Sequence, residues 1–361
     1  MATPLERLTG HLARLATHYD MIGQWPERSL AHLTAAGAWT WNIPRAYGGL
    51  ALPPESQLRA YEAVAAGCLS SLLILSQRDG ACELIASSAN DGLKDELLPR
   101  LAAHEMMASV GISQLTTSQQ GRKPALIAEP TAGGYRLRGY MPWVTAAEKC
   151  DLIVTGAALS DDKQVLAALP TDLAGLQIDA PMKLMALESS RTSEVHCRDV
   201  MVESRWVLGP PAGKALSGSS PVKLWVVAAA GLGLGRAMIQ QVQSHAGGAA
   251  GPLAEQAEDL AARYEAVRER FYKSAEQLGL SDEEGPPTTG LRVAVNDLLV
   301  RLAVGTLTFV KGSGFIRQRD AQRLVREAMF FLVWSATEDV RVQTLGRFLD
   351  RPEPESRSLA R

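Results

Sequence analysis

Cysteine is scarce in this sequence of 361 residues, which contains four cysteines and six histidines. The cysteines (Cys68, Cys82, Cys150 and Cys197) show neither metal-type spacing nor a closely spaced pair, and the histidines form no ligand pattern. This pattern excludes a disulfide scaffold and a zinc-finger-type site. We therefore predict reduced core thiols, no metal site and a cytoplasmic location.

The sequence also lacks a large excess of charge of either sign and a long apolar run. A formal net charge of −2 gives no electrostatic footprint for nucleic acid or an anionic membrane. The longest apolar run, residues 224–234, is too short and too glycine-rich to span a bilayer. The N-terminus MATPLERLTGHLARL has no signal-peptide pattern. We therefore expect a small-molecule substrate and no nucleic-acid or membrane partner.

What is present divides the chain into three parts. Residues 1–105 have apolar positions at helix spacing, with a break near residues 23–26. Short strand-like pieces separated by Gly, Pro, Asp or Ser fill residues 106–210, and helical spacing returns over residues 221–349. The pattern predicts an α+β multidomain protein: an N-terminal helical domain (1–105), a middle β-sandwich or barrel (106–210) and a C-terminal up-and-down four-helix bundle (221–349).

Two details of the C-terminal part can be predicted. Gly231, Gly233 and Gly235 lie in an apolar helix, where each glycine costs about 1 kcal/mol relative to alanine. We expect them to allow close approach of a neighbouring helix or a ligand. The last helix of the bundle is expected to cover residues 321–348.

The stretch around residues 133–154 is the candidate ligand wall. Paired glycines at 133–134 predict a tight turn between two strands. Pro142 removes a backbone donor, so the second strand should bend or lie at an edge where Trp143 and Thr145 emerge. The indole offers a stacking face and the hydroxyl a hydrogen bond, as a flat heteroaromatic ligand requires. The alternative is a buried Trp on an ordinary hairpin.

Five short runs follow one another along the chain: Ile43-Pro44 with Tyr47-Gly48-Gly49; GYRLRG at 134–139 with Trp143-Val144-Thr145; Ser190-Arg191-Thr192 with DVMV at 199–202; Gly312-Ser313-Gly314-Phe315; and RLVREA at 323–328. In their order and spacing these runs resemble the acyl-CoA dehydrogenase family, and the resemblance covers nearly the whole chain. It agrees with the helical, β, helical order.

The resemblance implies that FAD lies between the β domain and the bundle. It implies an oxidoreductase acting on the CH–CH bond of an acyl thioester or a similar substrate, with hydride transfer to flavin N5. It implies that Thr116, Thr117, Trp143, Thr145 and Thr337 bind the cofactor. The family forms dimers or tetramers through the C-terminal helices, so we expect a homodimer or homotetramer. An electron-transfer partner or a flavin reductase is expected as well.

The family's catalytic base is missing from its usual place. Ungapped alignment from residues 323–328 puts Ser335 where most members have Glu, and the other family position falls at Val222 or Lys223. A serine hydroxyl is no base near neutral pH without its own activator. Glu338 is the candidate substitute, but three residues along a helix moves a carboxylate by nearly one turn, roughly 5 Å. A solvated or ion-paired surface carboxylate is the favoured interpretation of Glu338.

Two departures concern the cofactor. Arg122, beside Lys123, stands where the family loop has a serine that helps hold substrate and flavin phosphate. Two cations there could neutralise a phosphate, and an exposed loop pair is the alternative. The segment that grips FAD across the family's dimer interface is not recognisable between residues 236 and 260. FMN is therefore the alternative cofactor.

Three functions stay open from the sequence. The first is an acyl-CoA dehydrogenase-like oxidoreductase with its base unassigned. The second is a two-component flavin-dependent monooxygenase of the same fold, which takes reduced flavin from a separate reductase and needs no α-proton base. The third is a catalytically inactive paralogue that binds flavin or an acyl group.

Overall fold

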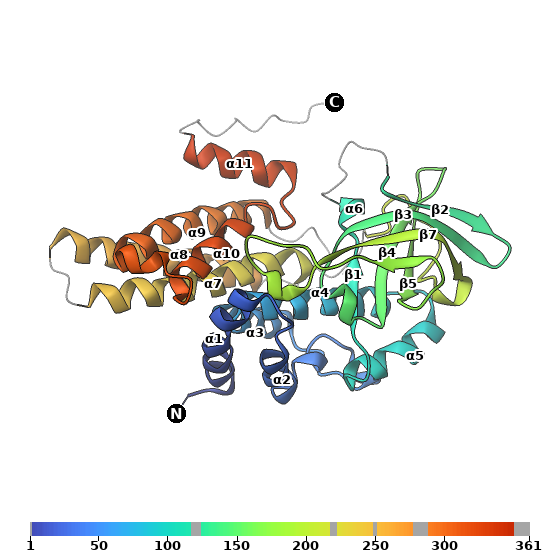
Figure 1. Ribbon diagram of the computed structural model, residues 1–361, viewed down its shortest axis with the longest axis horizontal. Helices are drawn as coiled ribbons and strands as arrows, with labels where there is room; N and C mark the ends of the chain where they lie inside the picture. The colour runs from blue at the N-terminus through green and yellow to red at the C-terminus, as the bar shows by residue number, and fades with distance from the viewer. Residues whose placement is uncertain (1, 117–123, 217–221, 248–250, 277–287, 350–361) are drawn as a thin grey trace.

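The computed structural model describes residues 2–116, 124–216, 222–247, 251–276 and 288–349 (Figure 1). Helices, then a sheet, then helices follow one another, as predicted. The helices of the N-terminal part are α1 (Pro4–Ile22), α2 (Glu27–Ala35), α3 (Pro54–Gly67), α4 (Leu69–Ala86) and α5 (Asp91–Ala102). The sheet contains β1 (Ala108–Gly111), β2 (Leu126–Thr131), β3 (Gly134–Val144), β4 (Leu152–Ala158), β5 (Gln164–Pro170), β6 (Leu176–Ile178) and β7 (Ser193–Glu203), with the short helix α6 (Ser113–Thr116) after β1. The C-terminal helices are α7 (Val222–Ala246), α8 (Pro252–Ala275), α9 (Thr288–Val310), α10 (Asp320–Phe330) and α11 (Glu338–Phe348).

The break predicted between the first two helices is confirmed. Helix α1 starts at a capping box, in which the Thr3 hydroxyl accepts from the Glu6 amide while the Glu6 carboxylate accepts from the Thr3 amide. It ends at Gly23, whose left-handed φ of 60° is open to glycine at little cost. The buried side chains of α1, among them Leu8 and Leu12, pack on the helices that follow.

The strands of residues 106–210 form one seven-stranded sheet with the order β1-β4-β2-β3-β7-β6, and β5 pairs with β4. The predicted turn at the paired glycines is confirmed, because β2 and β3 form an antiparallel hairpin that closes at Thr131 and Gly134. β3 lies inside the sheet, between β2 and β7. Its register with β7 shifts between Met141 and Val144, so Pro142 marks an irregularity and not an edge.

The C-terminal helices pack on the N-terminal ones through α7, which contacts α3, α8 and α9. A Cβ on Gly233 would lie 2.3 Å from the Glu62 carbonyl oxygen of α3, so only glycine allows this approach. The predicted role of the α7 glycines in close helix packing is confirmed at this position. Helix α9 belongs to a stretch, Thr289–Phe315, that is long and apolar enough to cross a membrane, yet 61% of its most apolar window is buried inside the protein. It is a core helix of this fold.

The expectation of one helix over residues 321–348 is wrong. α10 ends at Phe330, a turn follows, and α11 begins at Glu338. Arg292 of α9 donates hydrogen bonds to the carbonyl oxygens of Phe331 (2.5 Å) and Trp334 (2.9 Å), which a continuous helix would use internally. Ser335 has a left-handed φ of 49°, which no helix interior accepts.

Candidate functional site

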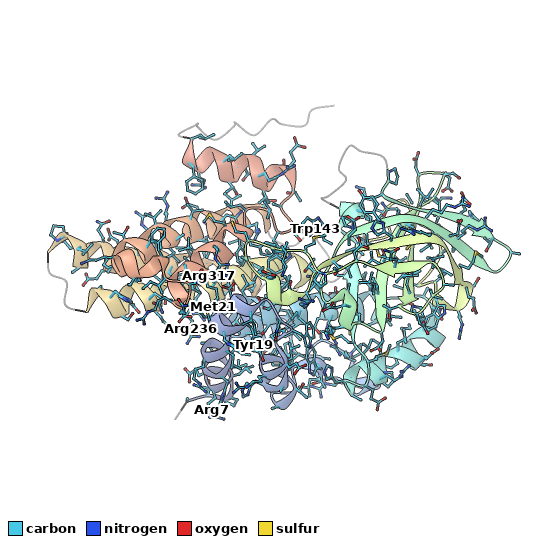
Figure 2. All side chains as sticks on the ribbon, in the orientation of Figure 1. Arg7, Tyr19, Met21, Trp143, Arg236 and Arg317 are labelled. Atoms are coloured by element: carbon cyan, nitrogen blue, oxygen red, sulfur yellow. The ribbon has the colours of Figure 1, made fainter. Side chains whose placement is uncertain are left out.

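Trp143 lies near the end of β3, and half of its surface (50%) is exposed. Its neighbours Met141 and Val144 are fully buried, so the register shift at Pro142 turns the indole outward while the strand stays packed. Figure 2 shows Trp143 at the end of the sheet nearest to the C-terminal helices in this view. The indole is therefore not packed inside the sheet, and its open face is available to a flat partner.

A group of buried hydroxyls follows Trp143 directly. The Thr145 Oγ1 atom lies 3.3 Å from Thr192 Oγ1, and Thr192 Oγ1 lies 2.9 Å from Ser190 Oγ. The Ala146 amide donates to the Ser190 carbonyl oxygen at 2.9 Å, which ties the end of β3 to the start of β7. Two of the runs that carry the family resemblance, nearly fifty residues apart in sequence, thus meet in space.

The end of β1 approaches the same place. A Cβ on Gly111 would lie 2.7 Å from the Met141 sulfur and 3.0 Å from Val144, so β1 and β3 touch here. The buried Gln114 side chain of α6 donates to the carbonyl oxygens of Gly111 (2.9 Å) and Gly156 (3.0 Å), which fixes the chain where it leaves β1. Predicted residue Thr116 is the last residue of α6.

The remaining predicted residues of this loop, Thr117, Arg122 and Lys123, lie outside the described residues. Sequence reasoning missed Ser113 and Gln114, which are the first polar side chains after the apolar strand β1. Their signal was the polarity change at the carboxyl end of a strand, where ligand-binding side chains commonly lie.

The turn between α10 and α11 contains Ser335, which the sequence predicts at the position of the family base. Ser335 is exposed, and Glu338 and Asp339 lie exposed in the first turn of α11. The Thr337 hydroxyl caps α11 by accepting from the Val340 amide at 3.4 Å. Burial lowers the pKa of the Arg292 guanidinium that holds this turn to about 9, so Arg292 is still protonated at neutral pH.

One buried carboxylate of α10 is engaged elsewhere. Glu327 lies 2.8 Å from Arg323 in a fully buried ion pair. Burial raises the pKa of Glu327, and the Arg323 charge opposes that shift. Because the carboxylate is paired and enclosed, it holds α10 in place and is no candidate for proton removal from a substrate.

Arg326 connects this helix to the rest of the site. Its guanidinium pairs with Asp20 of α1 at 2.5 Å and donates to the Met185 carbonyl oxygen at 2.5 Å. Met185 belongs to the segment that leads from β6 to Ser190 and Thr192. Arg326 thus ties α10 both to α1 and to the segment that precedes the hydroxyls of Ser190 and Thr192.

Two cavities lie away from Trp143 and the neighbouring hydroxyls. One, of about 230 Å³, is lined by α8, α9 and Arg347, and includes Arg263, Arg270 and Arg301. The other, of about 370 Å³, is lined by residues of α2 and by Trp25, Trp39 and His104. Neither contains a residue that the family resemblance assigns to the cofactor.

Comparisons with known proteins point to one family. The sequence model of the acyl-CoA dehydrogenase N-terminal domain matches residues 6–105. The "Probable acyl-CoA dehydrogenase fadE25" of Mycobacterium leprae is 23% identical over 94% of this chain and 92% of its own. Butyryl-CoA dehydrogenase from Megasphaera elsdenii superposes with a TM-score of 0.82 at 19% identity, over 97% of this chain and 99% of its own. Dibenzothiophene monooxygenase (TdsC) from Paenibacillus sp. A11-2, solved with FMN and indole, gives a TM-score of 0.80 at 15% identity, over 97% of each chain. With its helical, β, helical architecture, this chain has the acyl-CoA dehydrogenase fold, and its residues 6–105 match the N-terminal domain of that family.

Proposed function

We propose that this protein is a flavin-dependent oxidoreductase that binds FAD between the sheet and the C-terminal helices, against Trp143. The half-exposed indole at the end of β3 carries this proposal, because exposed tryptophan in such a position fits a flat ring that covers it. Bound there, a flavin would supply a two-electron acceptor. FMN is the alternative cofactor.

The polar side chains near Trp143 suit the edge of a flavin ring. Thr145 and Thr192 offer buried hydroxyls beside the indole. We assign Ser113, the first residue of α6 after β1, as a further candidate for a hydrogen bond to the ring, together with Thr116. Gln114 holds this loop by its amide and so positions Ser113.

Thr337 and Thr117 keep their predicted roles as cofactor contacts, and Arg122 as a substrate contact.

The reaction we propose is dehydrogenation of an acyl thioester, with an electron-transfer partner to reoxidise the flavin. Two of the compared proteins are acyl-CoA dehydrogenases by name, which supports this substrate class. The proposal assigns the role of catalytic base to no residue. Glu338 and Asp339 are exposed carboxylates three and four residues after Ser335, and Glu327 is excluded by its ion pair.

Anaerobic mixing of the flavin-loaded protein with acyl-CoAs of several chain lengths tests the reaction. We expect one of them to bleach the flavin absorption, and bleaching to persist in the Glu338→Gln variant. Loss of bleaching in Glu338→Gln, with the matched variant Glu55→Gln unaffected, would instead identify Glu338 as the base. If no acyl-CoA bleaches the flavin, dehydrogenation of acyl-CoAs is refuted.

A second candidate is a flavin-dependent monooxygenase. The prediction that Ser335 takes the place of the family carboxylate, and the likeness to dibenzothiophene monooxygenase, favour it. In that case reduced FMN or FAD with oxygen should convert a small aromatic compound such as indole into an oxygenated product. Formation of hydrogen peroxide alone, without an oxygenated product, counts against a monooxygenase. If acyl-CoAs also fail to bleach the flavin, the inactive paralogue is the remaining function.

A second copy of this chain is the proposed oligomeric partner. Large apolar side chains are exposed on the turn η6 (Lys311–Phe315) and on α11: Phe315, Val342, Leu345 and Phe348. Val342, Leu345 and Phe348 are spaced three residues apart along α11, and exposed apolar groups gathered on one element mark an association surface more often than a free one. We propose that these side chains belong to a homodimer or homotetramer interface.

A further inference from the structure

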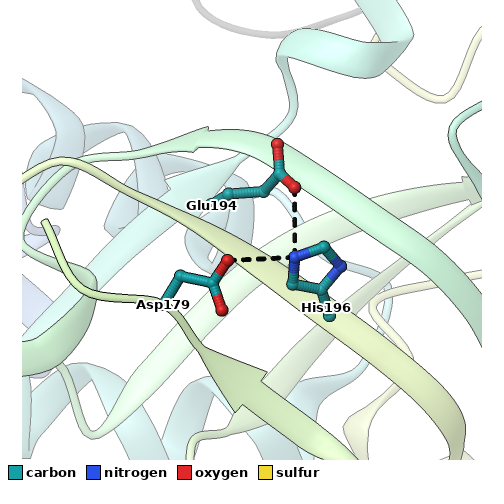
Figure 3. A group of neighbouring side chains, drawn as sticks. All are labelled: Asp179, Glu194 and His196. Carbon is teal, nitrogen blue, oxygen red and sulfur yellow. Dashed lines mark hydrogen bonds and ion pairs between the residues drawn. The ribbon is translucent and has the colours of Figure 1, made fainter. Parts of the chain in front are cut away.

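At the β6 edge of the sheet, two carboxylates approach the same nitrogen atom of one histidine (Figure 3). The Nε2 atom of His196 lies 3.2 Å from Asp179 Oδ2 and 3.0 Å from Glu194 Oε1. All three ligand atoms lie within 4.8 Å of one another, and all three side chains are partly exposed. None of these residues belongs to the proposed flavin site.

Backbone pairing places the three side chains together. Glu194 and His196 are two residues apart on β7, so they share one face of the strand. β6 pairs with β7 so that Gln177 faces His196, and the Asp179 amide then donates to the Glu194 carbonyl oxygen at 3.0 Å. The side-chain amide of Gln177 (Nε2) donates to Asp179 Oδ1 at 3.2 Å, which leaves Oδ2 directed at the imidazole. An outer hydrogen bond of this kind orients a ligand in metal sites.

The distances fit a metal ion better than a proton. An imidazole Nε2 carries at most one hydrogen, yet two carboxylates approach it. Zinc binds nitrogen and carboxylate oxygen at about 2.0–2.2 Å, which sets neighbouring ligand atoms about 2.8–3.1 Å apart in octahedral geometry and about 3.3–3.6 Å apart in tetrahedral geometry, a range of about 2.8–3.6 Å. The separations of 3.0 and 3.2 Å lie inside that range.

We propose that Asp179, Glu194 and His196 bind a divalent transition-metal cation, with Zn²⁺ as the reference ion. The two carboxylates balance its charge, and waters complete its coordination from the exposed side. An imidazole ligand favours Zn²⁺ and its neighbours in the first transition row over Mg²⁺ and Ca²⁺, which prefer oxygen alone.

Such an ion would act on structure. β6 is a three-residue edge strand, and the chain after it runs to Met182, whose amide donates to the Thr192 carbonyl oxygen at 2.9 Å, and then to Met185 beside Arg326. An ion bound by Asp179, Glu194 and His196 would therefore fix the start of the segment that leads to the buried hydroxyls of Ser190 and Thr192. The chemistry of a flavin does not require it.

Calorimetric titration of the full chain with ZnCl₂, after chelation and without an added histidine tag, tests the proposal. We expect saturable binding of one Zn²⁺ per chain and a higher melting temperature of the saturated protein. His196→Ala should weaken binding at least about tenfold, the size of loss that even outer partners of metal ligands cause. Co²⁺ should compete with Zn²⁺ and give a visible absorption that His196→Ala removes.

His245→Ala is the matched control, because His245 is exposed on α7 and lies near no described carboxylate ligand set. It should leave the affinity unchanged. Glu194→Gln keeps the side-chain shape and removes one charge, so it tests the site even if His196→Ala fails to fold. Absence of saturable binding, or equal weakening by His245→Ala and His196→Ala, would overturn the proposal.

Discussion

Trp143 is exposed between two buried neighbours, which is an unusual position for the largest apolar side chain unless a partner covers it. We predict that Trp143→Ala raises the dissociation constant for flavin about 2- to 12-fold, which corresponds to the roughly 0.5–1.5 kcal/mol of a stacked aromatic pair. Because the indole is half-exposed, its removal should change the melting temperature little. Flavin titration followed by protein fluorescence measures the affinity.

Trp206→Ala provides the control for this prediction. Trp206 lies in the turn after β7, with the Arg205 guanidinium 4.9 Å from its ring, and has no place in the proposed flavin site. Its removal should leave flavin affinity unchanged. A Trp143→Ala protein that binds flavin as tightly as the parent would show that the ring does not rest on this indole.

His104 gives the protein a predictable response to acid. Its ring stacks on Trp39 with centroids 4.5 Å apart, and burial together with the nearby Arg78 charge lowers the pKa of His104. A histidine whose pKa is lower in the folded state binds more protons when unfolded. Its contribution to stability is therefore complete above pH 6.5 and is lost as the pH falls below that value.

We predict a lower melting temperature at pH 5.5 than at pH 7.5, and a smaller difference between the two in His104→Asn. Asparagine suits this substitution because His104 has a left-handed φ of 54°. Thermal unfolding at the two pH values measures the effect. An unchanged pH dependence in His104→Asn would show that His104 does not titrate in this interval.

At the scale of elements, one buried carboxylate joins the N-terminal helices to the bundle. Glu62 of α3 pairs with Arg268 of α8 at 2.6 Å and accepts hydrogen bonds from the hydroxyls of Tyr264 and Tyr272. We predict that Glu62→Gln lowers the free energy of unfolding by about 3 kcal/mol, the lower end for breaking a buried pair, because Arg268 is partly exposed. Urea denaturation measures the loss.

The control for Glu62→Gln is the same change at Glu55, whose pair with Arg59 is exposed. Glu55→Gln should cost less than about 1 kcal/mol, as surface ion pairs do. Equal losses in the two variants would mean that the buried pair does not hold α3 to α8.

The sequence predicted elements well wherever one local signal decided them. The paired glycines gave the β2–β3 turn, and Gly23 gave the end of α1. The division between α10 and α11 escaped it, because apolar residues continue through Phe331 and Trp334. What ends α10 is Arg292, which comes from another helix about forty residues away.

The candidate site divides in the same way. Trp143 and Thr145 could be singled out from a strand and a proline, which are local signals, together with a resemblance that covers nearly the whole chain. The group of Asp179, Glu194 and His196 could not, because it depends on the register between β6 and β7. The sequence shows only that Glu194 and His196 are two residues apart, the spacing that puts side chains on one face of a strand.

At the scale of the molecule, the exposed apolar side chains of α11 predict association. Val342→Lys combined with Leu345→Lys should shift the protein from an oligomer to a monomer, because charge at both positions opposes burial in an interface. Light scattering coupled to size-exclusion chromatography measures the mass. Met201→Lys, at an exposed apolar position on β7, is the control and should leave the mass unchanged. A parent protein that is monomeric at all concentrations would refute the interface.

The whole account depends on a flavin held between the sheet and the C-terminal helices. The visible spectrum of the freshly purified protein, with the released cofactor identified and quantified, tests this most directly. We predict a flavin spectrum with up to one FAD per chain, or uptake of FAD or FMN to that ratio on reconstitution. A colourless protein that takes up neither flavin and gains no thermal stability from either would contradict the account.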